Sequence, residues 1–234
     1  LILADECNLT ANEGIAVFAG NSLSIFGQSD RLDAGTLTAS YTHDSSNAAI
    51  GGNGNSGTIN IHGGNIFAAG TSLAAGIGGG EDGNATVNIY GGNIKAAGGA
   101  RGAGIGGGDR GSSSVNIYGG NITAIGGANA AGIGGGFYAD GGNVSIYGGN
   151  IYASGGSNHY GSGFINAVGG GENAGINSLT IAENLSLYNN ETGEPVDSIS
   201  GLGSVSITEP APEPESFKVD YLKYNNGTFS AETS

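Results

Sequence analysis

Hydrophobic and polar residues alternate in short stretches that recur at a nearly constant spacing along the chain. In each stretch two apolar residues, Ile or Val, are separated by one polar residue. These stretches occupy residues 58–62, 86–90, 114–118 and 143–147. Side chains alternate between the two faces of a β-strand, so the Ile and Val residues of each stretch share one face. The pattern therefore predicts a series of similar strands, each buried on one side.

Each stretch is followed by a corner and by a second alternating stretch. The corner has the sequence Gly-Gly-Asn, and its asparagines are Asn65, Asn93, Asn121 and Asn150. Gly and Asn tolerate positive φ angles, so a sharp bend is expected in every repeat. The second stretch places Ile and Ala on one face. Its opposite face carries Phe67, Lys95, Thr123 and Tyr152.

A glycine-rich segment completes each repeat. Three copies of Ala-Gly-Ile-Gly-Gly-Gly are centred on Ile77, Ile105 and Ile133, and weaker copies surround Ile50 and Val168. The intervals between these central residues are 27, 28, 28 and 35. A fixed period of this size indicates a stacked-repeat protein.

These repeats predict an all-β fold, a right-handed parallel β-helix with coils of about 28 residues. Consecutive coils of such a fold lie ~4.8 Å apart. A left-handed β-helix is built on hexapeptides, which are absent here. The glycine content excludes a helical solenoid. The period is also too short for a β-propeller, whose blades need ~40 residues or more.

The regular repeats cover only part of the chain. Residues 1–208 are predicted to form the β-helix, followed by a Pro/Glu-rich linker at 209–216 and a tail or the start of a further module at 217–234. Within the β-helix we expect N-terminal coils at 1–47, regular repeats at 48–171 and a capping coil at 172–208.

Composition narrows the range of partners. The chain has 234 residues, 50 of them glycine, and a net charge of −14. A nucleic-acid backbone would be repelled by this charge. No apolar run approaches the ~20 residues of a membrane-spanning helix, so membrane insertion is not expected. Cys7 is the only cysteine, which precludes an intrachain disulfide. We expect a monomer.

Two repeated columns are predicted to be structural. The amides of Asn65, Asn93, Asn121 and Asn150 are expected to hydrogen-bond to one another in a ladder. Ile77, Ile105 and Ile133 are expected to fill the core. Residues 102–107 formally match the dinucleotide motif G-x-G-x-x-G, but no helix follows to bind a pyrophosphate. No nucleotide site is predicted.

An outward column of rings is the first candidate for binding. It contains His62, Tyr90, Tyr118 and Tyr147. Flat ring faces pack well on sugar rings, and Asn88 and Asn116 beside them would hydrogen-bond to sugar hydroxyls. The alternative is that the rings stack on one another and merely strengthen the sheet.

Acidic residues after the glycine-rich segments are the second candidate. They are Glu81, Asp82, Asp109, Asp140 and Glu172. Carboxylates gathered along one edge would suit Ca²⁺, which prefers oxygen ligands. The alternative is a solvated acidic edge. No other cofactor is expected.

Catalysis is not predicted. A glycosidase needs two carboxylates on either side of its substrate, and the outward strand positions carry none. A loop-borne polysaccharide lyase or hydrolase site remains an alternative, with Asp109 beside Arg101 or Arg110 as its candidate residues.

The recurring sequence VNIYGGNI and the segment GAGIGGG resemble the glycine-rich β-helix repeats of large bacterial cell-surface proteins. The opening LILADECNLTANEGIAVFAG is similar to the coil that introduces such arrays. Some relatives are described as carbohydrate-binding proteins with a polysaccharide-lyase-like fold. The resemblance implies an extracellular, bacterial surface location and a non-catalytic module for polysaccharide binding or adhesion. A purely structural stalk is the alternative.

Overall fold

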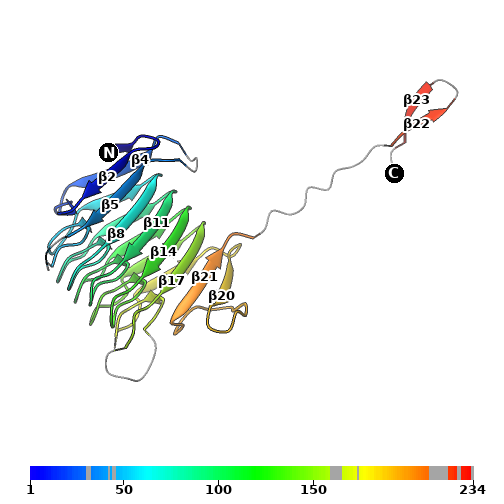
Figure 1. Cartoon of the computed structure of the whole chain (residues 1–234). Coiled ribbons are helices and arrows are strands. Elements are labelled where there is room, and N and C mark those ends of the chain that lie inside the picture. The colour runs from blue at the N-terminus through cyan, green and yellow to red at the C-terminus, as the bar shows by residue number, and fades with distance from the viewer. Residues whose placement is uncertain are drawn as a thin grey trace.

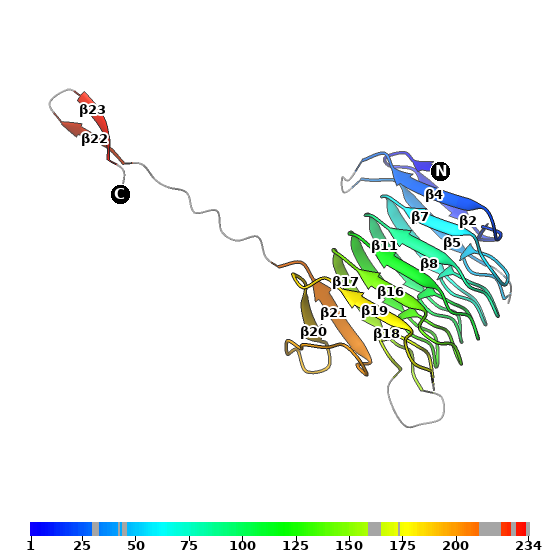
Figure 2. The ribbon, with the colours of Figure 1, turned by 180° about the vertical axis from the view of Figure 1, so that it is seen from behind.

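The computed structural model describes residues 1–29, 33–41, 43, 46–158, 165–172, 174–210, 221–225 and 228–232. Every regular element in these ranges is a β-strand (Figure 1). The described residues accordingly include no helix that is long and apolar enough to cross a membrane. Three sheets run along the stack of coils, as the front and back views show (Figures 1 and 2).

The first sheet contains the strands that precede the Gly-Gly-Asn corners. Its order is β1 (Ile2–Leu3), β4 (Ser22–Gly27), β7 (Thr58–Ile61), β10 (Thr86–Ile89), β13 (Ser114–Ile117), β16 (Asn143–Ile146) and β19 (Ser178–Ile181). All of these strands are parallel. Val87 pairs with Val115, so equivalent positions in these two consecutive coils are 28 residues apart, as the sequence period predicts.

The second sheet begins at the corners. Its order is β2 (Asn8–Ala11), β5 (Thr36–Ser40), β8 (Asn65–Ala69), β11 (Asn93–Ala97), β14 (Asn121–Ile125), β17 (Asn150–Ser154), β21 (Ser204–Thr208) and β20 (Ser186–Asn189). The third sheet lies in the glycine-rich segments. It contains β3 (Ile15–Ala16), β6 (Ile50–Gly51), β9 (Ile77–Gly78), β12 (Ile105–Gly106), β15 (Ile133–Gly134) and β18 (Val168–Gly169). The predicted parallel β-helix is confirmed.

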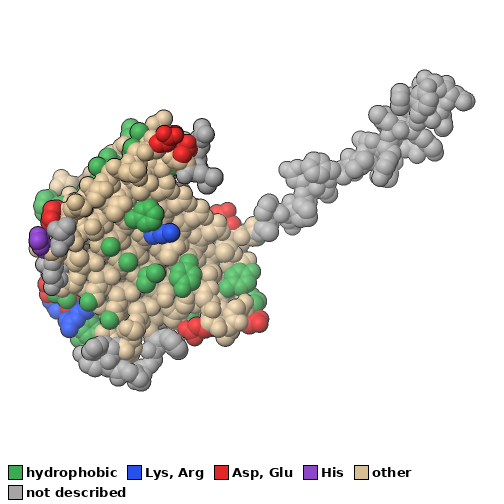
Figure 3. Space-filling model, in the orientation of Figure 1, with side chains coloured by type: hydrophobic (Ala, Val, Ile, Leu, Met, Phe, Trp, Pro, Cys, Tyr) green, Lys and Arg blue, Asp and Glu red, His purple; other side chains and the backbone are tan. Residues whose placement is uncertain are grey.

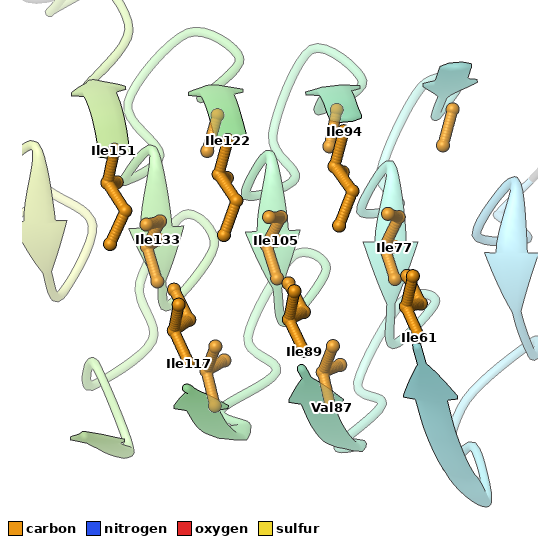
Figure 4. Packing of buried hydrophobic residues seen from close by; sticks show 14 of the residues in the cluster. Ile61, Ile77, Val87, Ile89, Ile94, Ile105, Ile117, Ile122, Ile133 and Ile151 are labelled. Carbon is orange, nitrogen blue, oxygen red and sulfur yellow. The ribbon is translucent and has the colours of Figure 1, made fainter. Parts of the chain in front are cut away.

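The core consists of isoleucine columns contributed by all three sheets (Figure 4). In one coil Ile89, Ile94 and Ile105 point toward one another, and their relative exposures are 0%, 1% and 0%. Full burial of such a side chain stabilises the fold by about 1.5–3 kcal/mol. Ile77, Ile105 and Ile133 are fully buried, so their predicted core role is confirmed.

Glycine is required in the third sheet because the coils approach closely there. Gly106 has a φ angle of +142°, which L side chains rarely adopt. A Cβ atom at Gly106 would also collide with the carbonyl oxygen of Gly134 in the next coil. The close packing of the coils therefore explains the glycine-rich motif.

The C-terminal end differs from the predicted capping coil at 172–208. β19 continues the first sheet in parallel, as expected. The next strand in the chain, β20, does not pair with β17. Instead β21 lies between them and is antiparallel to both. A strand of reversed direction cannot start another coil, so this pair ends the stack.

The predicted linker and tail are described only in part. Residues 211–220 lie outside the described residues. In the tail, β22 (Tyr221–Asn225) and β23 (Thr228–Glu232) form an antiparallel pair. The described part of the region that the sequence predicted to be a tail or the start of a further module thus contains one antiparallel pair of strands.

Candidate functional site

The predicted aromatic column exists, but its rings face one another. Successive centroids of Phe26, His62, Tyr90, Tyr118 and Tyr147 lie 4.3, 4.6, 4.9 and 5.2 Å apart. The angles between ring planes are 4° to 13°. The coil spacing of ~4.8 Å suits this stacking, which covers the flat faces and leaves ring edges toward solvent. The prediction that these faces meet sugar rings is therefore wrong for the interior of the column.

The asparagines beside the column also bind each other. The Nδ2 group of Asn88 donates to Oδ1 of Asn60 at 2.9 Å, and Asn116 donates to Asn88 at 2.9 Å. Asn88 and Asn116, which were predicted to bind sugar hydroxyls, thus form a ladder of their own. The outward side chains of the first sheet therefore bind one another and stabilise the stack of coils.

The ladder predicted at the corners is formed. Asn93 donates to Asn65 at 3.0 Å, Asn121 to Asn93 at 2.9 Å, and Asn150 to Asn121 at 3.2 Å. A primary amide has two donors and two acceptor lone pairs. The inner members of the ladder therefore keep one N–H and one lone pair each for an external group.

The solvent-facing side of the second sheet, which we call the outer face, differs from the exterior of the first sheet. One column across it contains Phe67, Lys95, Thr123, Tyr152 and Ser206. A groove of about 480 Å³ lies along this column and the adjoining asparagine ladder. Figure 3 shows separate hydrophobic side chains and a basic side chain on this side of the molecule.

The rings on the outer face are exposed and lie apart. Phe67 is 40% exposed and Tyr152 is 41% exposed, and no other described ring stacks on either. The Nζ atom of Lys95 is 5.5 Å from the centroid of Phe67. The Tyr152 hydroxyl accepts a hydrogen bond from Ser204 Oγ at 3.3 Å. Lys95 Nζ lies over one face of the Phe67 ring, so the available surfaces are the Tyr152 ring and the rest of the Phe67 ring. Lys95 and the Thr123 hydroxyl lie between the two rings in the column.

In the part of the chain that the structure describes, the groove carries a positive charge and no negative one, although the chain as a whole has a net charge of −14. None of the described residues that line it is a carboxylate. Lys95 forms no ion pair with a described carboxylate, in contrast to Arg101 and Arg110. The groove can therefore offer hydrogen bonds, ring faces and one positive charge, but not the carboxylate pair that glycoside hydrolysis requires.

Three of the acidic residues surround an arginine. Arg110 contacts Glu81 at 3.0 Å, Asp82 at 2.7 Å and Asp109 at 3.3 Å. Its hydrogen bond and charge hold the pKa of the Asp82 carboxyl below its usual value. The hydrogen bonds that Arg110 donates to Asp82 and Glu81 in turn raise the pKa of Arg110. Arg110 is thus a cation that three of the five predicted acidic residues contact.

The other predicted acidic residues do not join this group. The Asp140 side chain is exposed, whereas Glu172 is only 8% exposed. Among the described residues no three His, Cys, Asp or Glu side chains are arranged to hold a metal ion. The predicted calcium-binding group of Glu81, Asp82, Asp109, Asp140 and Glu172 is therefore not formed.

The alternative catalytic site is assembled but closed to substrate. Arg101 and Arg110 both contact Asp109, at 3.4 and 3.3 Å. Asp109 is only 1% exposed, so a polymer could not reach its carboxylate. The arrangement is that of an ion-pair cluster that holds neighbouring loops together.

The sequence did not single out the outer face, although it placed Phe67, Lys95, Thr123 and Tyr152 on one side of their strands. The residue types in this column differ from coil to coil, and this difference could have indicated a binding surface. The structural columns repeat one residue type, as in the asparagine ladders, or one kind of side chain, as in the aromatic column, because ladders and stacks need matching partners. This column changes its residue type in every coil, so no such stacking rule governs it.

The family model of the beta helix repeat matches residues 59–81, 87–109 and 115–137. Each match runs from the first strand of a coil through the corner to the residue after the glycine-rich segment. Comparisons with curated proteins and with solved structures gave no significant match. The repeat match and the three sheets of stacked coils together show that the chain folds as a parallel β-helix built of repeats.

Proposed function

We propose that this protein is a non-catalytic polysaccharide-binding or adhesion module of an extracellular bacterial surface protein, and that it binds glycan on the outer face. The observation that carries the proposal is the pair of exposed, unstacked rings, Phe67 and Tyr152, on the groove of about 480 Å³. Binding sites are typically concave, with apolar walls and a few well-placed polar groups.

The chemistry of the groove fits a pyranose chain. The C–H face of a sugar ring is apolar and slightly positive, so it packs on the negative face of an aromatic ring. Thr123 lies beside the rings, as do the amide N–H and oxygen lone pair that Asn93 and Asn121 each keep outside the ladder, and these groups would hydrogen-bond to hydroxyls. The surface therefore combines apolar and hydroxyl-binding groups at neighbouring positions.

The length of the groove fits several sugar residues. Phe67 and Tyr152 are three coils apart, which corresponds to roughly 14 Å at ~4.8 Å per coil. An extended glycan chain along the coil axis would meet a new set of side chains at each coil. A linear polysaccharide would thus contact both rings at once.

Affinity gel electrophoresis on a panel of plant, bacterial and host polysaccharides tests the proposal. We expect retardation by at least one polymer, and Phe67→Ala and Tyr152→Ala should each weaken it by about tenfold, the effect of losing 1.4 kcal/mol. Phe18→Ala is the matched control, because Phe18 is 63% exposed but lies away from the outer face. An equal loss in the control would contradict the assignment of the site.

A structural spacer is the second candidate. It is favoured by the ring stack and the two asparagine ladders, which strengthen the long axis of the molecule. If no polysaccharide retards the wild-type protein, the spacer role is the better account.

A further inference from the structure

A second groove follows the corner between the first and second sheets. The aromatic column borders it on one side and the corner asparagine ladder on the other. Its volume is about 310 Å³, and His62, Tyr90, Gly92, Asn93, Gly120 and Asn121 are among its lining residues. Asn93 and Asn121 also line the groove on the outer face, so the two grooves adjoin.

The protein itself places a carboxylate at the C-terminal end of this corner. The N–H group of Gly149 donates a hydrogen bond to Oε1 of Glu209 at 2.8 Å. Gly148 and Gly149 are buried at that end of the corner. A carboxylate on a backbone N–H is a charge-assisted hydrogen bond and one of the stronger kinds in proteins. Glu209 therefore shows which chemical group this corner accepts.

The equivalent N–H groups of the two preceding coils have no such partner. Gly92, Gly120 and Gly149 occupy equivalent corner positions and have nearly equal φ angles of 97°, 100° and 98°. The structure records no hydrogen bond from the N–H of Gly92 or Gly120 to a described group. Both residues are partly exposed and line the groove. Two further positions for carboxylates thus lie open beside Glu209.

We propose that the corner groove binds the carboxylates of a uronic-acid-containing polysaccharide on the N–H groups of Gly92 and Gly120. The inference rests on the proposed function and names the class of glycan. The sugar rings of the same chain lie across Asn93 and Asn121 and continue onto the outer face, where Lys95 supplies a positive charge. Backbone N–H groups bind anions without added positive charge, which lets a chain of net charge −14 accept an acidic polymer.

The first test compares an oligogalacturonate with the same oligosaccharide after its carboxyl groups are reduced to alcohols. At about 0.15 M salt, where long-range repulsion is screened, we expect the acidic form to bind at least about tenfold more tightly. In ¹⁵N-edited NMR spectra the amide proton signals of Gly92 and Gly120 should move on titration with the acidic form only. Equal binding of both forms overturns the carboxylate inference and leaves the proposed function intact. Binding of neither form counts against both.

Variants of Glu209 provide an independent test. Glu209→Gln removes the charge but keeps an oxygen on the Gly149 N–H, whereas Glu209→Ala frees that N–H for the ligand. We expect Glu209→Ala to bind oligogalacturonate several-fold more tightly than Glu209→Gln. Glu191→Ala, which removes an exposed charge at the far end of the cap, should match the wild type.

Identical affinities for the two Glu209 variants would overturn the role of the glycine N–H groups. Poly-glutamate serves as a competitor. If it displaces oligogalacturonate at an equal concentration of carboxylate, the groove recognises acidic polymers in general and the assignment to a glycan is wrong.

Discussion

Replacement of Tyr118 by alanine separates a structural role of the aromatic column from a binding role. Tyr118 stacks on Tyr90 at 4.9 Å and on Tyr147 at 5.2 Å, so the variant loses two ring contacts. Such contacts contribute about 0.5–1.5 kcal/mol each beyond area burial, which predicts a loss of about 1–3 kcal/mol in the free energy of unfolding. Glycan binding on the outer face should be unchanged.

Urea denaturation followed by circular dichroism measures this loss. With a slope of about 2 kcal/mol/M, the midpoint should fall by about 1 M. Tyr118→Leu is the matched control, because it keeps an apolar side chain but removes the ring. A double-mutant cycle with Tyr90→Ala should give a favourable coupling energy of about 0.5 kcal/mol or more. Zero coupling, or unchanged stability together with lost glycan binding, would refute the stacking account.

Two further substitutions test the packing of the coils and the ion-pair cluster. Gly106→Ala should destabilise the protein by more than about 4 kcal/mol, because its Cβ collides with the backbone of the next coil, whereas Gly175→Ala, which meets nothing within 4 Å, should be tolerated; equal melting temperatures would contradict this. Arg110→Ala should lower the melting temperature at pH 7. Asp82 has a lowered pKa in the folded protein, so its contribution is complete above pH ~4 and is lost as the pH falls through that pKa. The difference between variant and wild type should therefore narrow below pH ~4, and a constant difference would count against this role for Asp82.

The sequence was sufficient to predict the repeating part of the fold because the repeats are nearly identical. The 28-residue register between Val87 and Val115 follows directly from the spacing of the apolar residues. The corner ladder was predictable for the same reason, since Asn93 and Asn121 occupy equivalent places in successive coils. Stacked coils bring equivalent residues together, so the spacing of the repeats in the sequence shows which residues are in contact.

The orientation of the rings was not predictable from alternation alone. Alternation shows that Tyr90 and Tyr118 point out of the sheet, but the side-chain torsion angles decide whether a ring presents its face or its edge. The close match between coil spacing and ring spacing favoured stacking. The predicted calcium site in the acidic loops was wrong for a related reason. The sequence does not show that the Arg110 side chain reaches back one coil to Glu81 and Asp82.

The antiparallel cap lay beyond the reach of the repeat pattern. Residues 178–181 and 186–189 both look like strands of one more coil, and the first does extend its sheet. The position next to β17 goes to β21, which comes later in the chain and runs in the opposite direction. Strand order outside the periodic region depends on long-range pairing, which local alternation does not encode.

A crystal structure of the protein with a bound oligosaccharide tests the central claim most directly. The account predicts electron density for sugar rings over Phe67 and Tyr152 on the outer face, next to Lys95 and the Asn93–Asn121 part of the ladder. Density confined to the edges of the Tyr90 and Tyr118 rings, with an empty outer face, would contradict it.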